Sequence, residues 1–282
     1  MKSNSTTKSA STSLVLLFRL IAANDWQQLK DMFLSDPEGA KTFQYLAALV
    51  AKSSSYNGMT ILHACAHARF NPPAVLINRM IELCPDAPSS QDCLNRTPLH
   101  VAAGTGASSA VIKVFVDSYP DACIIQDKDG RTPLMMCCDS SCELFEVSRE
   151  RTHRRVPSYR AITVLLSASL NSAIMEDEDG ISAIEYALCS KADLQTIQLI
   201  ESAAKKAMLK KHEFMKVMLK NHEEKRANSN ADLQTVQLIQ SAAQKVMRKK
   251  GQRAGFHGRY FCGYQGFLSE TFPYCSIGMI IC

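Results

Sequence analysis

The stretch Cys93–Gly106 reads Cys-Leu-Asn-Arg-Thr-Pro-Leu-His-Val-Ala-Ala-Gly-Thr-Gly. Thr97 is a favourable N-cap residue, and Pro98 suits the first helical position, where its missing N–H costs nothing. The apolar residues that follow lie on one face at helical spacing, and their small side chains allow a neighbouring helix to approach closely. The stretch therefore predicts a short helix that ends at the Gly-Thr-Gly sequence.

Three further stretches repeat this pattern in weaker form. They read Asn-Gly-Met-Thr-Ile-Leu-His-Ala-Cys at 57–65, Asp-Gly-Arg-Thr-Pro-Leu-Met-Met-Cys at 129–137 and Asp-Gly-Ile-Ser-Ala-Ile-Glu-Tyr-Ala at 179–187. The phrase Thr-Pro-Leu-His-x-Ala-Ala resembles the anchor of the ankyrin repeat, a helix–turn–helix unit of about 33 residues. The resemblance implies an all-α solenoid of about five units, with anchors that begin at Thr60, Thr97, Thr132 and Ser182.

The segment before the first anchor resembles a degenerate ankyrin unit. Leu14–Leu34 contains two short amphipathic patterns but no Thr-Pro anchor. A terminal repeat has one face in solvent and is expected to be atypical, so this segment is predicted to be the N-terminal cap. Phe43–Lys52 is predicted to be an additional helix before the second unit. The repeat domain then spans residues 14–203, with an insertion at about residues 139–159 that should project from the stack.

The two ends of the chain differ from the repeat domain. Residues 1–13 are rich in Ser and Thr and are predicted to be disordered. Residues 204–250 are predicted to form a basic helical extension, which includes a partial duplication because Ala192–Lys211 recurs as Ala231–Lys250. Residues 251–282 show no period, and we expect an irregular or disordered tail.

Composition limits the classes of function. The chain has 282 residues, of which 46% are hydrophobic, and a formal charge of +5, too small to indicate nucleic-acid binding for the whole chain. The 11 cysteines are an odd number without a Cys-x-x-Cys motif, which favours reduced thiols. We therefore expect a cytoplasmic protein, with the nucleus as the alternative, and we do not expect organelle targeting.

The sequence gives no indication of catalysis. It contains no Gly-rich phosphate loop, nucleophile elbow or kinase signature. His63 and His67 lie four residues apart, a spacing that zinc can use, but no further ligand pair is near them. The resemblance implies instead that His63 and His100 hydrogen-bond the backbone of a neighbouring hairpin. We expect a non-catalytic protein with no metal, no cofactor and no small-molecule substrate.

The residue before each anchor is the candidate for partner binding. Stacking of the units would place these residues side by side at the hairpin edge of the concave face, which ankyrin proteins commonly use for partners. Arg96 and Arg131 would be adjacent and would offer planar donors to the carboxylates of a partner protein. The predicted partner-binding residues are Met59, Arg96, Arg131 and Ile181. The sequence thus predicts a protein-binding scaffold or adaptor whose partner presents acidic groups.

The basic extension is the second candidate. Within residues 204–226, lysines surround methionines and other apolar residues at helical spacing, which is typical of a target for an acidic, calmodulin-like groove. The pattern also admits a short coiled coil or an anionic membrane surface, and a solvated helix is the simplest alternative. A nucleic-acid-binding regulator would use residues 149–155 and 245–253. The residues selected in this helix are Lys205, Lys206, Lys210, Lys211, Phe214 and Met218.

Overall fold

The computed structural model describes residues 3–68, 72–142 and 156–229. The chain divides into two compact units, Met1–Glu213 and Phe214–Cys282. The described part of the second unit is the last portion of helix α11, which spans Leu194–Ser229.

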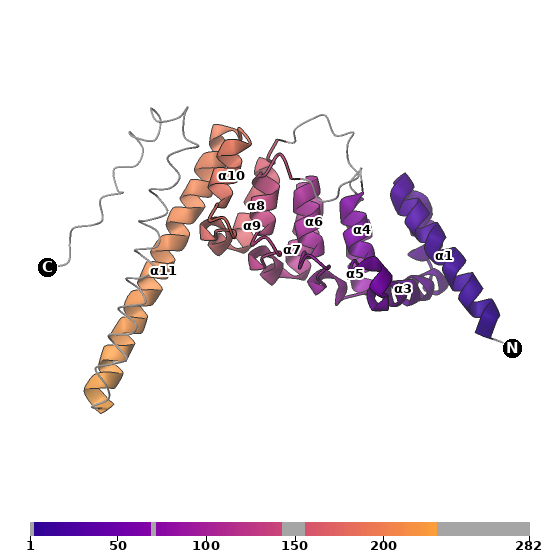
Figure 1. Ribbon diagram of the computed structural model, residues 1–282, viewed down its shortest axis with the longest axis horizontal. Coiled ribbons are helices and arrows are strands. Elements are labelled where there is room, and N and C mark those ends of the chain that lie inside the picture. Colours follow the sequence, from indigo (N-terminus) through magenta and orange to yellow (C-terminus); the bar gives the residue numbers. More distant parts are fainter. Residues whose placement is uncertain (1–2, 69–71, 143–155, 230–282) are drawn as a thin grey trace. The chain divides into compact units, whose positions relative to one another are not determined.

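An inner row of short helices forms the centre of the first unit (Figure 1). Each helix packs against the next one in the row. Each begins immediately after an anchor Thr or Ser in extended backbone, which is the conformation of an N-cap residue. In the two helices with the full Thr-Pro anchor, proline occupies the first turn. The row consists of α4 (Ile61–His67), α6 (Pro98–Thr105), α8 (Pro133–Cys138) and α10 (Ala183–Cys189).

An outer row packs behind the inner row. Its helices α5 (Ala74–Leu83), α7 (Ser109–Ser118) and α9 (Tyr159–Ala168) contact one another in order, and each forms a pair with the preceding inner helix. Ser108 and Ser158 cap α7 and α9, because their side chains accept a hydrogen bond from the backbone N–H three residues later. Short 3₁₀ turns follow these helices at Ala87–Ser89, Pro120–Ile124 and Leu170–Ile174.

The N-terminal cap differs from the prediction. Helix α1 (Ser3–Ala23) contacts α4 and extends the inner row, whereas α3 (Pro37–Lys52) contacts α5 and extends the outer row. The prediction that Leu14–Leu34 alone forms the cap is therefore corrected. The short helix α2 (Trp26–Phe33) joins the two, and the predicted additional helix is part of α3. Asp36 accepts a hydrogen bond from Gly39 N, which explains why a helix starts at Pro37.

The N-terminus also differs from the prediction of disorder for residues 1–13. The structure places residues 3–13 in α1, where they continue the helix that Leu17, Leu20 and Ile21 fix by burial in the core. A helix that is already nucleated by packing can be extended at low cost, even through Ser- and Thr-rich sequence.

One hydrophobic core runs through the first unit. Its fully buried side chains come from α1 through the first turns of α11, and they include Leu29, Phe43, Met80, Phe115 and Leu165. Each pair of helices buries its apolar face against its neighbours, so stability is distributed along the stack.

Helix α11 follows α10 in the chain. Asp193 caps its first turn by accepting a hydrogen bond from Thr196 N, and Ile200, Ala203 and Ala207 are buried. The helix continues without a break across the predicted domain boundary at residue 204. The predicted insertion falls where α8 and α9 are separated, but residues 143–155 lie outside the described residues. The duplicated copy at residues 231–250 and the tail at residues 251–282 also lie outside them.

Candidate protein-interaction surface

A loop precedes each inner helix, and we call these loops the first to fourth hairpins (residues 55–59, 92–96, 127–131 and 177–181). The last three share one construction. The Oδ1 atoms of Asp92, Asp127 and Asp177 each accept hydrogen bonds from the amides two and four residues later, at 2.8–3.0 Å. This Asx arrangement adds to a backbone bond, because the N–H of each of these aspartates also donates to the carbonyl four residues later, at 2.9–3.1 Å. The hairpins are therefore preformed.

The fourth position of each hairpin is left-handed. The φ angles of Gly58, Asn95, Gly130 and Gly180 are 77°, 59°, 77° and 78°. At Gly130 a Cβ atom would lie 2.7 Å from the amide nitrogen of Glu178 in the next hairpin. Glycine is therefore needed there for close approach as well as for the backbone angle.

Backbone hydrogen bonds join successive hairpins. Cys93 N donates to Asn57 O at 2.7 Å, Lys128 N to Leu94 O at 3.0 Å, and Glu178 N to Asp129 O at 3.1 Å. Each bond connects one hairpin to the next along the stack. The four hairpins thus form a continuous hydrogen-bonded ladder, and their exposed side chains are held at fixed relative positions.

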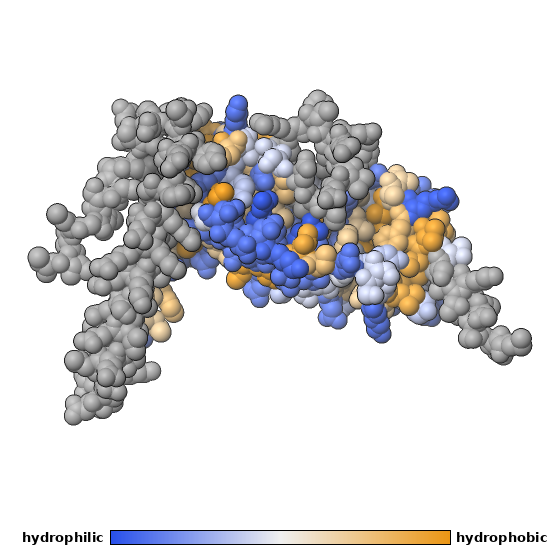
Figure 2. Space-filling model, in the orientation of Figure 1, coloured by the Kyte–Doolittle hydropathy of each residue, from blue (hydrophilic) through white to orange (hydrophobic). Residues whose placement is uncertain are grey.

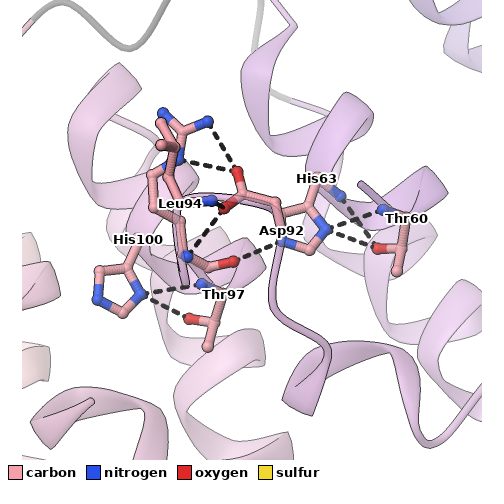
Figure 3. Close-up of polar contacts among 7 residues, drawn as sticks. Thr60, His63, Asp92, Leu94, Thr97 and His100 are labelled. Atoms are coloured by element: carbon pink, nitrogen blue, oxygen red, sulfur yellow. Dashed lines mark hydrogen bonds and ion pairs between the residues drawn. The ribbon is translucent and has the colours of Figure 1, made fainter. Parts of the chain in front are cut away.

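Two anchor histidines tie the inner helices to this ladder (Figure 3). The backbone N–H groups of Thr60 and Thr97 donate to Nδ1 of His63 and His100, at 3.0 and 3.1 Å. The ring proton must then be on Nε2, which donates to Arg96 O at 2.9 Å from His63 and to Ile125 O at 3.1 Å from His100. The prediction that both histidines hydrogen-bond the backbone of a neighbouring unit therefore agrees with the geometry.

Burial keeps both imidazoles neutral. Desolvation lowers the pKa of His63, and it lowers the pKa of His100 to about 4, although the hydrogen bonds to backbone carbonyls act in the opposite direction. A neutral ring can accept at Nδ1 and donate at Nε2 at the same time. Neither ring is placed as an acid–base catalyst or as a metal ligand.

The last two units use different residues at the histidine position. In α8, Thr132 N lies 3.4 Å from the sulfur of Met135. In α10, the carboxylate of Glu185 accepts from Ser182 N at 2.7 Å, which is a capping box within the unit.

The structure corrects the prediction for Arg96. This residue is only 5% exposed, and its guanidinium binds the Oδ2 atom of Asp92 through Nε at 2.8 Å and Nη2 at 2.7 Å. The hydrogen bonds of Asp92 to Arg96 and Leu94 lower its pKa although burial alone would raise it. Arg96 therefore stabilises its own hairpin and does not offer its donors to a partner.

Arg131 is directed differently, although it follows Asp127 with the same spacing. It is partly exposed, its Nη1 lies 3.6 Å from Oδ2 of Asp139, and its guanidinium lies over the ring of Tyr186 at 5.6 Å from the centroid. The Tyr186 hydroxyl donates to Asp177 Oδ2 at 2.6 Å. Arg96 and Arg131 do not form the predicted pair of exposed arginines.

The other selected residues are accessible. Met59 and Ile181, at the ends of the first and fourth hairpins, are partly exposed. The six residues selected in the basic helix are all exposed on α11, with Phe214 at 62% and Met218 at 52%. Their role in binding stays a prediction.

The sequence reasoning missed an apolar pocket next to the first hairpin. The rings of Phe18 on α1 and Tyr56 stack with centroids 5.5 Å apart, and with Met59 and Ala64 they line a cavity of about 190 Å³. Tyr56 occupies the hairpin position of Cys93, Lys128 and Glu178 in the later hairpins. The sequence signal that could have indicated the pocket is Tyr56, because the other three hairpins have no aromatic residue at this position.

Among the described residues, no group of three or more His, Cys, Asp or Glu side chains is placed to hold a metal ion. The same residues include no helix with the length and apolar character needed to cross a membrane. The described cysteines are all free thiols.

Paired helices in two rows, joined by hairpins that bond edge to edge, define an all-α repeat protein. Comparison with protein families assigns the repeat: residues 67–147 match the model for ankyrin repeats, in three copies. The predictions of ankyrin repeats and of an all-α repeat fold are confirmed. No curated protein matches the chain. Ankyrin repeats generally mediate protein–protein interactions and are typically non-catalytic.

Proposed function

We propose that this protein is a non-catalytic scaffold or adaptor that binds another protein through the inner helices and the hairpin ladder. The observation that supports the proposal most directly is the ladder itself, in which backbone bonds hold four hairpins in register. A surface that is ordered before binding loses less conformational entropy when a partner docks, so more of the contact energy becomes affinity.

The charge of the ladder changes the expected partner. With Arg96 buried, the prediction of an acidic partner loses its main support. The exposed charged side chains of the third and fourth hairpins are Lys128, Asp129, Glu178 and Asp179. Because three of these four are acidic, we propose a partner that presents basic groups to this end of the ladder.

Affinity capture with the full chain as bait tests the scaffold proposal. The double substitution Met59→Lys and Ile181→Lys should remove the captured partner, because it places positive charges at two partly exposed ladder positions and repels a basic partner. Val75→Lys is the matched control, since Val75 is 79% exposed on the outer helix α5. Equal capture by the wild type and the double variant would contradict binding through the ladder.

Helix α11 supports a second candidate function. Met208, Leu209, Phe214 and Met218 are 52–63% exposed on a helix whose lysines are also exposed. An exposed apolar and basic helix suits an acidic groove of the calmodulin type. Titration of the full chain with calcium-loaded calmodulin, against a Phe214→Glu/Met218→Glu variant, tests this function. Strongly salt-dependent binding to unrelated DNA would favour the nucleic-acid alternative instead.

The compartment is part of the same proposal. We propose a cytoplasmic or nuclear location, where thiols remain reduced. Fractionation of cells that express the tagged full chain tests it, and recovery in a membrane-enclosed organelle other than the nucleus would contradict it.

A further inference from the structure

We propose that the hairpin ladder binds an extended peptide segment that carries one bulky apolar side chain and, about five to nine residues away, basic side chains. The apolar side chain enters the pocket beside Phe18, Tyr56 and Met59, and the basic side chains meet the third and fourth hairpins. This inference rests on the proposed scaffold function and specifies the chemistry of its partner.

The pocket exists because the cap has no hairpin. Every later hairpin lies against the preceding one and receives or donates a backbone bond across that edge. Among the described residues, helix α1 lies beside the first hairpin on its other side, where the rings of Phe18 and Tyr56 stack. The space that another hairpin would fill is left as a cavity with mostly apolar walls.

The size of the pocket suits one large side chain. Its volume is about 190 Å³, and an apolar cavity of about 150 Å³ is large enough for benzene. A leucine, methionine or phenylalanine side chain therefore fits. Val15, one turn before Phe18 on α1, is 67% exposed and extends the apolar surface at this end. Figure 2 shows apolar residues gathered over the α1 end of the first unit.

The exposed side chains change from apolar at the first hairpin to net acidic at the fourth, because Lys128 and Asp129 on the third hairpin carry opposite charges. The pocket stands at the first hairpin, Leu94 is 42% exposed on the second, Lys128 and Asp129 are exposed on the third, and Glu178 and Asp179 on the fourth. The backbone bonds fix this order in space. A ligand that follows the ladder must therefore be apolar at one end and basic at the other.

The spacing of the repeats sets the spacing within the peptide. Packed helices lie about 8–10 Å apart, so the third and fourth hairpins are roughly 16–30 Å from the first. An extended chain advances about 3.3 Å per residue, which gives about five to nine residues between the anchor and the basic group. A helical ligand rises only about 1.5 Å per residue, so it would need about 11–20 residues between the same two groups.

Peptide display on the full chain tests the inference. Random peptides of about 15 residues, selected on the wild-type protein, should share a bulky apolar residue separated from Lys or Arg by the predicted interval. The variant Ala64→Phe fills the pocket, and Val75→Phe adds the same bulk to an exposed apolar site on α5. Circular dichroism and urea midpoints confirm that both variants are folded.

Fluorescence anisotropy of the selected peptides should then show three effects. Ala64→Phe lowers affinity about tenfold or more, Val75→Phe does not, and Glu178→Lys/Asp179→Lys lowers affinity for peptides that retain their basic residues. Replacing the apolar residue of the peptide by Ala has the same effect as filling the pocket.

Other outcomes overturn the inference. Selected peptides that lack the apolar residue, or that bind the Ala64→Phe variant unchanged, contradict the pocket. If Met59→Lys/Ile181→Lys still abolishes partner capture while Ala64→Phe does not, the scaffold function stands and only the pocket is wrong. Self-association of the full chain that Ala64→Phe abolishes would identify a second copy of the chain as the occupant instead.

Discussion

The imidazole Nε2 of His63 lies 2.9 Å from the carbonyl oxygen of Arg96, so one hydrogen bond connects an inner helix to the hairpin of the next unit. His100 Nε2 lies 3.1 Å from the carbonyl oxygen of Ile125, and so connects α6 to the segment that leads into the third hairpin. Both rings are almost completely buried. In a repeat protein such bonds contribute to the interface between neighbours, which determines how cooperatively the stack unfolds.

Substitution of His100 by Leu should lower the free energy of unfolding by about 1–3 kcal/mol. The variant leaves the buried N–H of Thr97 and the carbonyl of Ile125 without this partner, and unsatisfied buried polar groups carry that cost. Met135→Leu, at the same position in the next unit, is the control and should cost less than about 1.5 kcal/mol. Urea unfolding measures both, and equal losses would show that the histidine bonds contribute nothing specific.

The stability of the first unit should fall as the pH decreases from about 6.5 to about 4. The pKa of His100 in the folded state is about 4, below its ordinary value, so in this window the unfolded chain binds a proton that the folded chain does not. The loss attributable to His100 approaches 1.4 kcal/mol per pH unit, and above pH 6.5 this contribution is constant.

Urea midpoints of the wild type and of His100→Leu, compared across this pH range, isolate the effect. The difference between the two should shrink as the pH falls. Asp127, whose burial raises its pKa, changes stability in the opposite direction near pH 4, but it is present in both proteins and cancels. A difference that is independent of pH would contradict a neutral, buried His100.

Removal of the buried guanidinium should be far more costly than removal of an exposed one. Arg96→Met leaves the carboxylate of Asp92 buried without its charged partner, and we expect a loss of about 3 kcal/mol or more. Arg79→Met removes a pair with Glu82 in which both side chains are about half exposed, and should cost less than about 1 kcal/mol. Urea unfolding decides the matter, and similar losses would mean that Arg96 is accessible to solvent.

The local features of the fold could be predicted from the sequence, because N-caps and proline positions depend on a few adjacent residues. Thr97, Pro98 and the equivalent anchors gave the inner helices within a residue or two. The position of α3 in the outer row could not be predicted, since it depends on packing against α5. The sequence identifies a helix but does not state which neighbour it contacts.

The contacts of the candidate site were also not predictable from the sequence. Asp92–Arg96 and Asp127–Arg131 have the same spacing, yet Arg96 pairs with its own aspartate while Arg131 turns to Asp139 and Tyr186. The direction of Arg131 depends on residues outside its hairpin, Asp139 at the end of α8 and Tyr186 in the next unit. The pocket depends likewise on Phe18 and Tyr56, which lie far apart in the sequence and meet through the stacking of α1 beside α4.

Thiol reactivity should differ between exposed and buried cysteines among the described residues. Cys93 and Cys189 are exposed and should react with N-ethylmaleimide in the native protein. Burial raises the pKa of Cys65 to about 12 and that of Cys123 to about 11, and the thiolate is the reactive form. Mass spectrometry of the labelled peptides should show Cys65 and Cys123 modified only in urea. Rapid native labelling of Cys65 would contradict the packing of α4 against α5.

Gly130→Ala tests whether the hairpins form a single bonded ladder. The residue has a φ of 77°, and a Cβ atom there would lie 2.7 Å from the amide nitrogen of Glu178, the group that donates to Asp129 O. We expect a loss of about 2 kcal/mol, because a left-handed alanine costs about 1–2 kcal/mol and the fourth hairpin must also move. Asn95→Gly is the control: it relieves the same backbone angle without adding atoms and should leave stability nearly unchanged or slightly higher. Hydrogen exchange at the amide of Glu178 should be faster in Gly130→Ala alone, whereas unchanged exchange would mean that the two hairpins are not joined by this bond.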